Sequence, residues 1–226
     1  MRFVCLTSLA LCLAAPAAAQ EIIVTADREA LLAERPGSVA QLRSDDLAAI
    51  GAQVPSEALN RLPGVSIQRN NGVENLIAIR SPVLTGGQSA GSFLVLDNGV
   101  PIRAPGFSNV NQIWETSFDF ADGVTVVRGP GSALYGSNAV HGVIDVQGPD
   151  RGVSRARLDY SDLGRISGMA TVALGDQVVL GFAVERDAGW RDQSGLDRAA
   201  VIGAWRGSRG AWDIDARCLA QNLNQE

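Results

Sequence analysis

The chain has 226 residues, 46% of them hydrophobic, and a formal net charge of −5, which suits one or two packed domains. All 19 basic side chains are arginine, so lysine chemistry such as a Schiff base or a P-loop lysine is excluded. The acidic balance gives no electrostatic case for nucleic acid, and no stretch reaches the roughly 18 apolar residues of a spanning helix.

The N-terminus predicts a signal peptide at residues 1–19. Arg2 supplies the positive end, residues 3–14 the apolar segment, and Ala17 to Ala19 the small-residue cleavage site. We expect cleavage after Ala19 and export of the mature chain; the alternative is a buried N-terminal helix. Cys218 is then the one cysteine left, so the exported protein is held together by packing and not by a disulfide.

Residues 20–36 begin with a short β-branched run and continue with polar, turn-forming sequence. The run consists of Glu21, Ile22, Ile23, Val24, Thr25 and Ala26. One interpretation is a free extended peptide that a partner captures by strand addition, where main-chain hydrogen bonds supply much of the affinity. The alternative is an edge strand of the domain that follows.

Residues 37–148 predict a small α+β domain, because short strands and helices alternate without a regular βαβ repeat. Ser44 to Asp46 are expected to cap a helix that Gly51 ends, and Pro55 opens a second helix. Asn98-Gly99 between apolar runs favours a type I′ hairpin. The expected strands are 39–42, 65–68, 76–80 and the two arms of 93–102.

Residues 149–226 predict long alternating strands. The candidates are 154–162, 165–174, 177–187, 197–207 and 211–222. Their length, with one apolar and one polar face, is typical of a transmembrane barrel; the alternative is a soluble β-sandwich. Five strands cannot close a barrel, so we expect the sequence to be part of a longer protein.

The glycine-rich loop between the runs 124–128 and 142–146 contains no recognisable catalytic or phosphate-binding motif. Gly131 and Gly136 have the spacing of a phosphate-binding loop, but Ser137 stands where the lysine must be. His141 is the one histidine, no nucleophile elbow is present, and no cluster of metal ligands can be formed. We expect no enzyme, no catalytic residue, no metal and no cofactor.

A set of motifs in a fixed order resembles the TonB-dependent outer-membrane receptors. Arg128 to Gly136 followed by Gly142 to Val146 looks like the end of their plug domain, and residues 59–65, 79–80 and 96–102 match other plug motifs. Residues 21–26 are similar to the TonB box. His141 replaces the first glycine of the usual pair, and Asp145 stands where asparagine is common.

The resemblance implies a plug inside a barrel of the bacterial outer membrane, and TonB of the inner membrane as the partner that pulls on the box. It implies a small nutrient ligand, such as a ferric siderophore or cobalamin, and contact with outer-membrane lipid. Arg80 and Arg128 match plug arginines that pair with barrel carboxylates in the family. A second match is the plug loop of the family, which corresponds here to Gly129, Gly131, Tyr135, Gly136 and Gly142. The arginines could instead brace loops, and the chain could be a secreted or periplasmic binding module without a pore.

Overall fold

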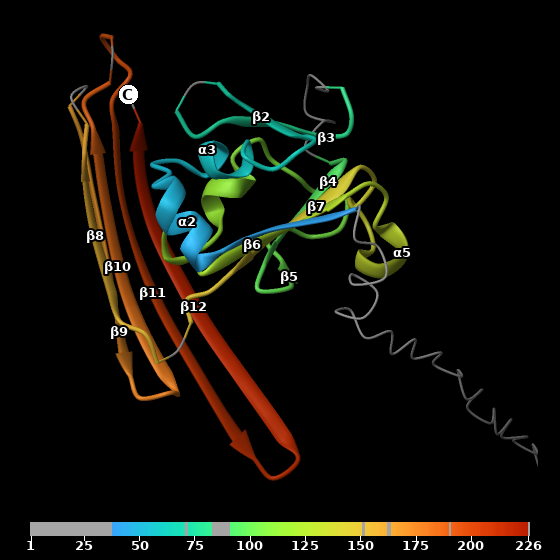
Figure 1. Ribbon diagram of the computed structural model, residues 1–226, viewed down its shortest axis with the longest axis vertical. Helices are drawn as coiled ribbons and strands as arrows, with labels where there is room; N and C mark the ends of the chain where they lie inside the picture. Colours follow the sequence, from blue (N-terminus) through green and yellow to red (C-terminus); the bar gives the residue numbers. More distant parts are fainter. Residues whose placement is uncertain are drawn as a thin grey trace, which may run out of the picture.

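The computed structural model describes residues 38–70, 72–82, 91–150, 152–161, 164–189 and 191–225. These residues form two parts that lie side by side (Figure 1). One is an α+β domain built from residues 38–150. The other is a sheet of five long strands, here called the long-strand sheet, and the helices α2 and α3 lie on the side of the domain that faces it (Figure 1).

The α+β domain contains seven strands and several short helices within the described residues. The strands are β1 (Val39–Arg43), β2 (Val65–Arg69), β3 (Asn75–Ile79), β4 (Phe93–Asp97), β5 (Val100–Pro101), β6 (Gly123–Arg128) and β7 (Gly142–Gln147). The helices are α2 (Ser44–Ile50), α3 (Pro55–Leu59), α5 (Ser132–Tyr135) and the 3₁₀ turns η1 (Gln112–Glu115) and η2 (Phe118–Phe120).

Five of these strands form one sheet in the order β1-β6-β7-β4-β5, in which only β4 and β7 run parallel. The strands β2 and β3 form a separate hairpin. Apolar side chains of both sheets and of α3 pack into one core; its large members that lie wholly inside include Leu59, Ile79, Phe93 and Ile144. Removal of this apolar area from water is the main stabilising term of the domain.

Two local predictions can be compared with the observed turns and caps. Asn98 and Gly99 both have positive φ (52° and 77°), as a type I′ turn requires, so that prediction is confirmed. Ser44 to Asp46, which were expected to cap the helix from outside, form its first turn, and Asp46 makes a capping contact. Helix α2 starts at Ser44 with Arg43 as its N-cap, because the Asp46 carboxylate accepts a hydrogen bond of 2.9 Å from the Arg43 N–H.

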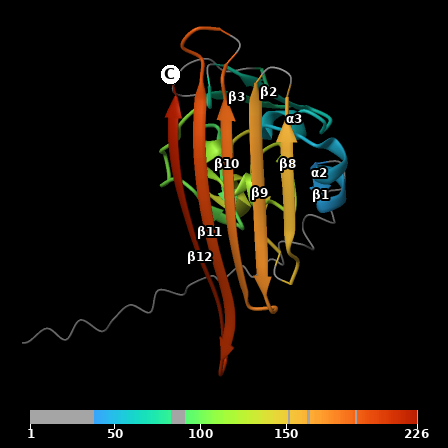
Figure 2. The same cartoon turned by 90° about the vertical axis from the view of Figure 1, so that its left-hand side faces the viewer.

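The long-strand sheet is an antiparallel meander in the order β12-β11-β10-β9-β8 (Figure 2). Its strands are β8 (Arg155–Tyr160), β9 (Arg165–Leu174), β10 (Val178–Asp187), β11 (Leu196–Arg209) and β12 (Trp212–Gln225). All five predicted strands are present, and the last two extend further than predicted. The sheet does not close on itself within the described residues. No helix among the described residues is long and apolar enough to cross a membrane.

The two faces of the long-strand sheet differ in chemistry. The face away from the α+β domain carries exposed apolar side chains, among them Leu158, Tyr160, Ile166, Val172, Leu174, Leu180, Phe182, Val184, Val201 and Trp205. The face toward the domain carries Arg155, Arg157, Asp159, Arg165, Glu185 and Arg198. An apolar outer and polar inner face over strands of this length agrees with the predicted alternation.

Candidate functional site at the interface between the domain and the long-strand sheet

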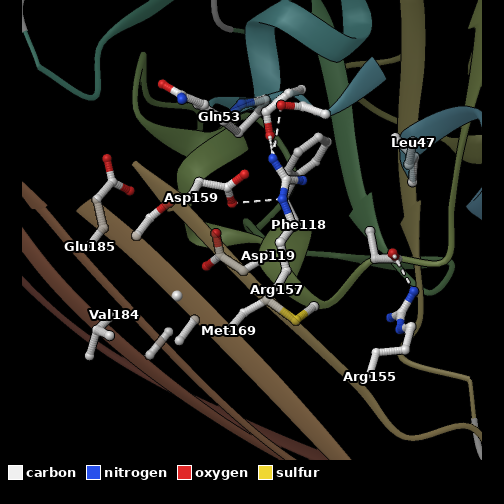
Figure 3. Close-up of a pocket in the computed structure, with 18 of the residues that line it drawn as sticks. Leu47, Gln53, Phe118, Asp119, Arg155, Arg157, Asp159, Met169, Val184 and Glu185 are labelled. Carbon is white, nitrogen blue, oxygen red and sulfur yellow. Dashed lines mark hydrogen bonds and ion pairs between the residues drawn. The ribbon is translucent and has the colours of Figure 1, made fainter. Parts of the chain in front are cut away.

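A cavity of about 590 Å³ lies between α2 and η2 on one side and strands β8 to β11 on the other (Figure 3). Leu47 and Phe118 contribute apolar surface from the domain, and Met169 contributes it from β9. The rest of the lining includes charged groups from both parts, so the interface combines apolar contact with polar anchoring.

Two arginines of β8 reach across the interface to the domain (Figure 3). Arg155 forms an ion pair of 2.5 Å with Asp122 and donates to the carbonyl oxygen of Phe120 at 3.1 Å. The Arg157 Nη2 donates to the carbonyl oxygens of Gly51 and Ala52 at 2.8 and 3.1 Å. These carbonyls lie at the C-terminus of α2, where a cation is favourable because helix dipoles are negative there.

A buried ionic cluster forms the next part of the interface. The Glu185 carboxylate lies 2.8 Å from Arg165 and 3.9 Å from Arg198, and the side chains of all three are at most 7% exposed. Arg198 in turn binds Asp119 of η2 through both of its terminal nitrogens, at 2.5 and 3.0 Å. Because one carboxylate contacts both arginines, Glu185 holds each of them facing the domain.

Each arginine of this cluster also makes a second type of contact with the domain. Arg165 donates to the carbonyl and side-chain oxygens of Gln53. The guanidinium of Arg198 lies over the ring of Trp114, 5.2 Å from its centroid, which is a cation–π contact. With side chains of Arg165, Glu185 and Arg198 at most 7% exposed, this cluster contains the most deeply buried of the described ion pairs, and removal of one partner from such a pair is costly.

Strand β12 adds a weaker set of contacts. Arg217 donates to the carbonyl oxygen of Gly148, at the point where the chain leaves the domain. The Gln221 side chain accepts from Arg198 and donates to the carbonyl oxygen of Thr116 at 3.3 Å. The attachments therefore reach the domain at three places: after α2, around η1 and η2, and at its exit.

Asp122 shows the electrostatic cost of this arrangement. Burial raises the pKa of its carboxyl above the ordinary aspartate range, because loss of water outweighs the backbone N–H of Asp150 and the charge of Arg155, which both lower it. The carboxyl group of Asp122 is thus largely enclosed at the interface, with Arg155 of the long-strand sheet as its cationic partner.

The described contacts across the interface involve other arginines than the two that the resemblance singled out. Arg80 and Arg128 of the domain were predicted to pair with carboxylates of the barrel. In the described contacts the cations lie on the long-strand sheet, and the domain supplies carbonyls and carboxylates. The guanidinium of Arg128 donates to the carbonyl oxygens of Pro63 at 2.6 Å and Val39 at 3.3 Å, both within the domain.

Arg80 is exposed and has a positive φ of 48°, and its backbone N–H donates to the carbonyl oxygen of Gly64 at 2.8 Å. A plug–barrel role for Arg80 and Arg128 stays a prediction. Sequence reasoning missed the arginines of β8, β9 and β11 as attachment residues. The sequence marks them as arginines at the inward positions of alternating strands. This pattern predicts a polar face but does not indicate which groups the arginines contact.

The predicted glycine loop lies at the far ends of β6 and β7, on the side of the domain away from the long-strand sheet (Figure 1). A Cβ at Gly142 would come within 2.8 Å of the Ile79 side chain, so close packing requires glycine there. Gly129 and Gly136 have positive φ (123° and 82°) and make the turns around α5. Gly131 accepts the N–H of Tyr135, which closes the helical turn.

Other predicted features are partly outside the described residues. The candidate TonB box at 21–26 lies outside them. His141 packs beside the ring of Phe93. Among the residues that the structure describes, no three histidine, cysteine or acidic side chains gather where they could hold a metal ion.

A small α+β domain attached by polar groups to the inner face of long strands, whose outer face is apolar, defines a plug against the wall of a membrane barrel. Residues 32–143 match the family model described as the TonB-dependent Receptor Plug Domain. The chain belongs to the TonB-dependent receptor family through this domain, which we call the plug from here on. The strands after it resemble the start of the barrel of such receptors.

Curated and solved relatives agree with this assignment. The vitamin B12 transporter BtuB of Vibrio cholerae is 32% identical over 182 residues, which are 76% of this chain and 28% of that protein. The ferric yersiniabactin uptake receptor FyuA of Yersinia pestis has a TM-score of 0.60 at 17% identity, covering 81% of this chain and 31% of that one. The pyoverdine outer membrane receptor FpvA of Pseudomonas aeruginosa has a TM-score of 0.61 at 12% identity, covering 82% and 27%.

The chain thus spans between a quarter and a third of the length of these relatives. The relatives named here are transporters and receptors, which supports the expectation that the protein is not an enzyme. The likeness to the two solved structures, at low identity, shows the fold.

Proposed function

We propose that the chain is the plug-bearing part of an outer-membrane receptor that takes up a scarce nutrient, such as a ferric siderophore or cobalamin, with energy supplied through TonB. Residues 1–19 would be the signal peptide, 20–36 the TonB box and a flexible segment, 37–148 the plug and 149–226 the first barrel strands. The observation that carries the proposal is the attachment of a plug to the long-strand sheet by polar contacts.

The chemistry of the interface supports a plug that can be released. Hydrogen bonds to carbonyl oxygens, such as those from Arg157 to Gly51 and Ala52, are exchanged for hydrogen bonds to water when the surfaces separate. An apolar interface of the same size would expose its buried surface to water when the parts separate, and it would lose the full free energy of that burial. The polar surface therefore allows a closed pore at rest and opening under a pulling force.

The apolar outer face supports a position in the membrane. Side chains such as Leu180, Phe182 and Val201 point away from the plug and are about half exposed. In water an exposed apolar face of this kind favours association with other apolar surfaces, whereas in a membrane it contacts lipid directly. Recovery of the protein in the outer-membrane fraction would support the proposal, and recovery in the soluble periplasmic fraction would favour a binding module without a pore.

The box at 21–26 is the proposed attachment point for TonB. Strand addition uses main-chain N–H groups, and proline lacks one. In a full-length receptor carrying this sequence, Ile22→Pro is expected to abolish energised uptake of cyanocobalamin or a ferric siderophore, whichever the receptor binds, and to leave equilibrium binding of that ligand unchanged. Ile22→Val is the matched control and is expected to retain uptake. Loss of binding in Ile22→Pro would contradict the assignment of the box.

A further inference from the structure

The turn between β4 and β5 is bonded to the exit segment (residues 147–150), through which the chain leaves the plug. The Asn98 side chain donates through Nδ2 to the carbonyl oxygen of Gly148 and accepts the Gly148 N–H through Oδ1, both at 2.9 Å. Its backbone N–H donates to the carbonyl oxygen of Val146 at 2.7 Å. The parallel pairing of β4 with β7 ends at Asp97 and Val146, so the Asn98 amide extends this pairing into the exit segment.

The same turn also holds the start of η2. The Asp97 carboxylate accepts the backbone N–H of Ser117 at 2.6 Å and its hydroxyl at 3.0 Å, and Ser117 is almost fully buried. The Asp97 carboxylate also accepts an N–H of the Asn98 amide at 2.6 Å. Asn98 thus uses both amide N–H groups and its amide oxygen, which fixes the orientation of the side chain. A single side chain therefore connects the exit segment with η2.

The exit segment and η2 lie directly against each other. Gly148 has a positive φ of 130°, and a Cβ there would come within 2.7 Å of the Asp122 nitrogen and 2.9 Å of the Phe120 carbonyl oxygen. Such an approach is open only to glycine. The Asp122 N–H also donates to the carbonyl oxygen of Gln147 at 2.8 Å. The positions of the exit segment and of the end of η2 are therefore set together.

Three arginines of the long-strand sheet find their acceptors in this part of the plug. The contacts are those of Arg217 with the carbonyl oxygen of Gly148, of Arg155 with Asp122 and the carbonyl oxygen of Phe120, and of Arg198 with Asp119. The described hydrogen bonds of Asp97 and Asn98 stay within the plug. These two side chains therefore act on the attachments through the positions of the acceptors.

We propose that Asn98 is a positioning residue for closure of the pore, because it holds the exit segment and η2 in the arrangement in which the three arginines bind together. This rests on the proposed function, in which the plug closes a pore. Loss of the amide leaves the Gly148 N–H without its partner in a buried segment, which is costly. The exit segment and η2 then shift relative to each other, and the three attachments no longer form together.

The test is ion conductance of a full-length receptor carrying this sequence in planar lipid bilayers. Asn98→Gly removes the amide and keeps the turn, because glycine adopts the positive φ of 52° at this position without strain. The parent is expected to stay closed for most of the time, and Asn98→Gly to open roughly tenfold more often.

Asn60→Ala is the matched control. Asn60 makes the same kind of reciprocal pair inside the plug, because it donates to the carbonyl oxygen of Ile67 at 3.0 Å and accepts the Ile67 N–H at 2.6 Å. Its loss is expected to lower the unfolding temperature of the plug about as much as Asn98→Gly does. Opening is expected to stay at the level of the parent. Equal opening in the two variants would overturn the proposal, because opening would then follow stability and not position.

A double-mutant cycle shows whether Asn98 acts through Gly148. Arg217→Gln is expected to increase opening by itself and to add little in the Asn98→Gly background, because the carbonyl that Arg217 binds is already displaced. Independent effects that multiply would overturn the proposal. Should Asn98→Gly fail to assemble, Asp97→Asn decides, since it weakens the contacts with Ser117 at the same turn. Unchanged opening in Asp97→Asn would then overturn the proposal.

Urea separates this inference from the proposed function. Moderate urea loosens the plug, so the parent is expected to conduct in urea if the plug closes a pore. No conductance in urea would overturn the proposed function and, with it, this inference. Conductance in urea, together with equal opening of Asn98→Gly and the parent in its absence, would overturn this inference alone.

Discussion

Two short helices on either side of residues 51–53 differ in how firmly the fold holds them. Helix α2 has no buried residue and faces a cavity, whereas α3 has four buried residues among its five. Both are short helices of the same plug, of seven and five residues. The difference arises from tertiary packing, and it divides the plug into a loosely held N-terminal segment and a firmly held remainder.

The largest expected effect is loss of the ionic cluster that holds the firm part. Arg198→Ala leaves the buried Glu185 with Arg165 alone and leaves the partly exposed Asp119 without its arginine; removal of one partner from a buried pair costs about 3–5 kcal/mol. We expect the plug of a full-length receptor to unfold at a clearly lower temperature in calorimetry.

The neighbouring cross-strand pair of β10 and β11 supplies a control for this prediction. Arg186 lies opposite Asp197 as Arg198 lies opposite Glu185, but on the outer face, 3.8 Å from its partner and largely exposed. Arg186→Ala is expected to change stability by about 0–1 kcal/mol. Equal losses in the two variants would show that burial of the cluster does not stabilise the plug.

A smaller effect compares one leucine in each helix. Leu59 is fully buried in the core, so Leu59→Ala is expected to lower the free energy of unfolding by about 2–5 kcal/mol. Leu47 is half-buried beside the cavity, and Leu47→Ala is expected to lower it by about 1 kcal/mol or less. Chemical denaturation of the purified receptor measures both, and similar losses would remove the proposed division of the plug.

The smallest effect concerns the start of α2. Asp46→Ala removes the carboxylate that accepts the Arg43 N–H, and loss of a cap costs about 0.5–1 kcal/mol. Since α2 is weakly packed, this change is expected to increase local opening of residues 39–50 and to leave the main unfolding transition nearly in place. Asp46→Asn, which keeps an acceptor oxygen, should restore most of the protection.

The sequence was sufficient to predict the α+β plug, the five long strands and the direction of their apolar face. Each of these depends on local information, such as an Asn-Gly turn or the alternation along one strand of Leu180, Phe182 and Val184. Signals of this kind are carried by neighbouring residues. They can therefore be recognised in the sequence without knowledge of the tertiary contacts.

The partners across the interface could not be predicted in the same way. Arg157 and Gly51 are 106 positions apart, and the acceptor is a backbone carbonyl, which every residue has. No pattern of residue types therefore marks the contact. The resemblance directed attention to Arg80 and Arg128 of the plug, while the described attachments come from the arginines of β8, β9, β11 and β12.

Amide hydrogen exchange on a full-length receptor carrying this sequence, in lipid and without TonB, tests the division of the plug most directly. We expect the hydrogen-bonded amides of residues 39–50 to exchange at least roughly tenfold faster than those of α3 and β2. Equal protection on both sides of residues 51–53 would contradict the division.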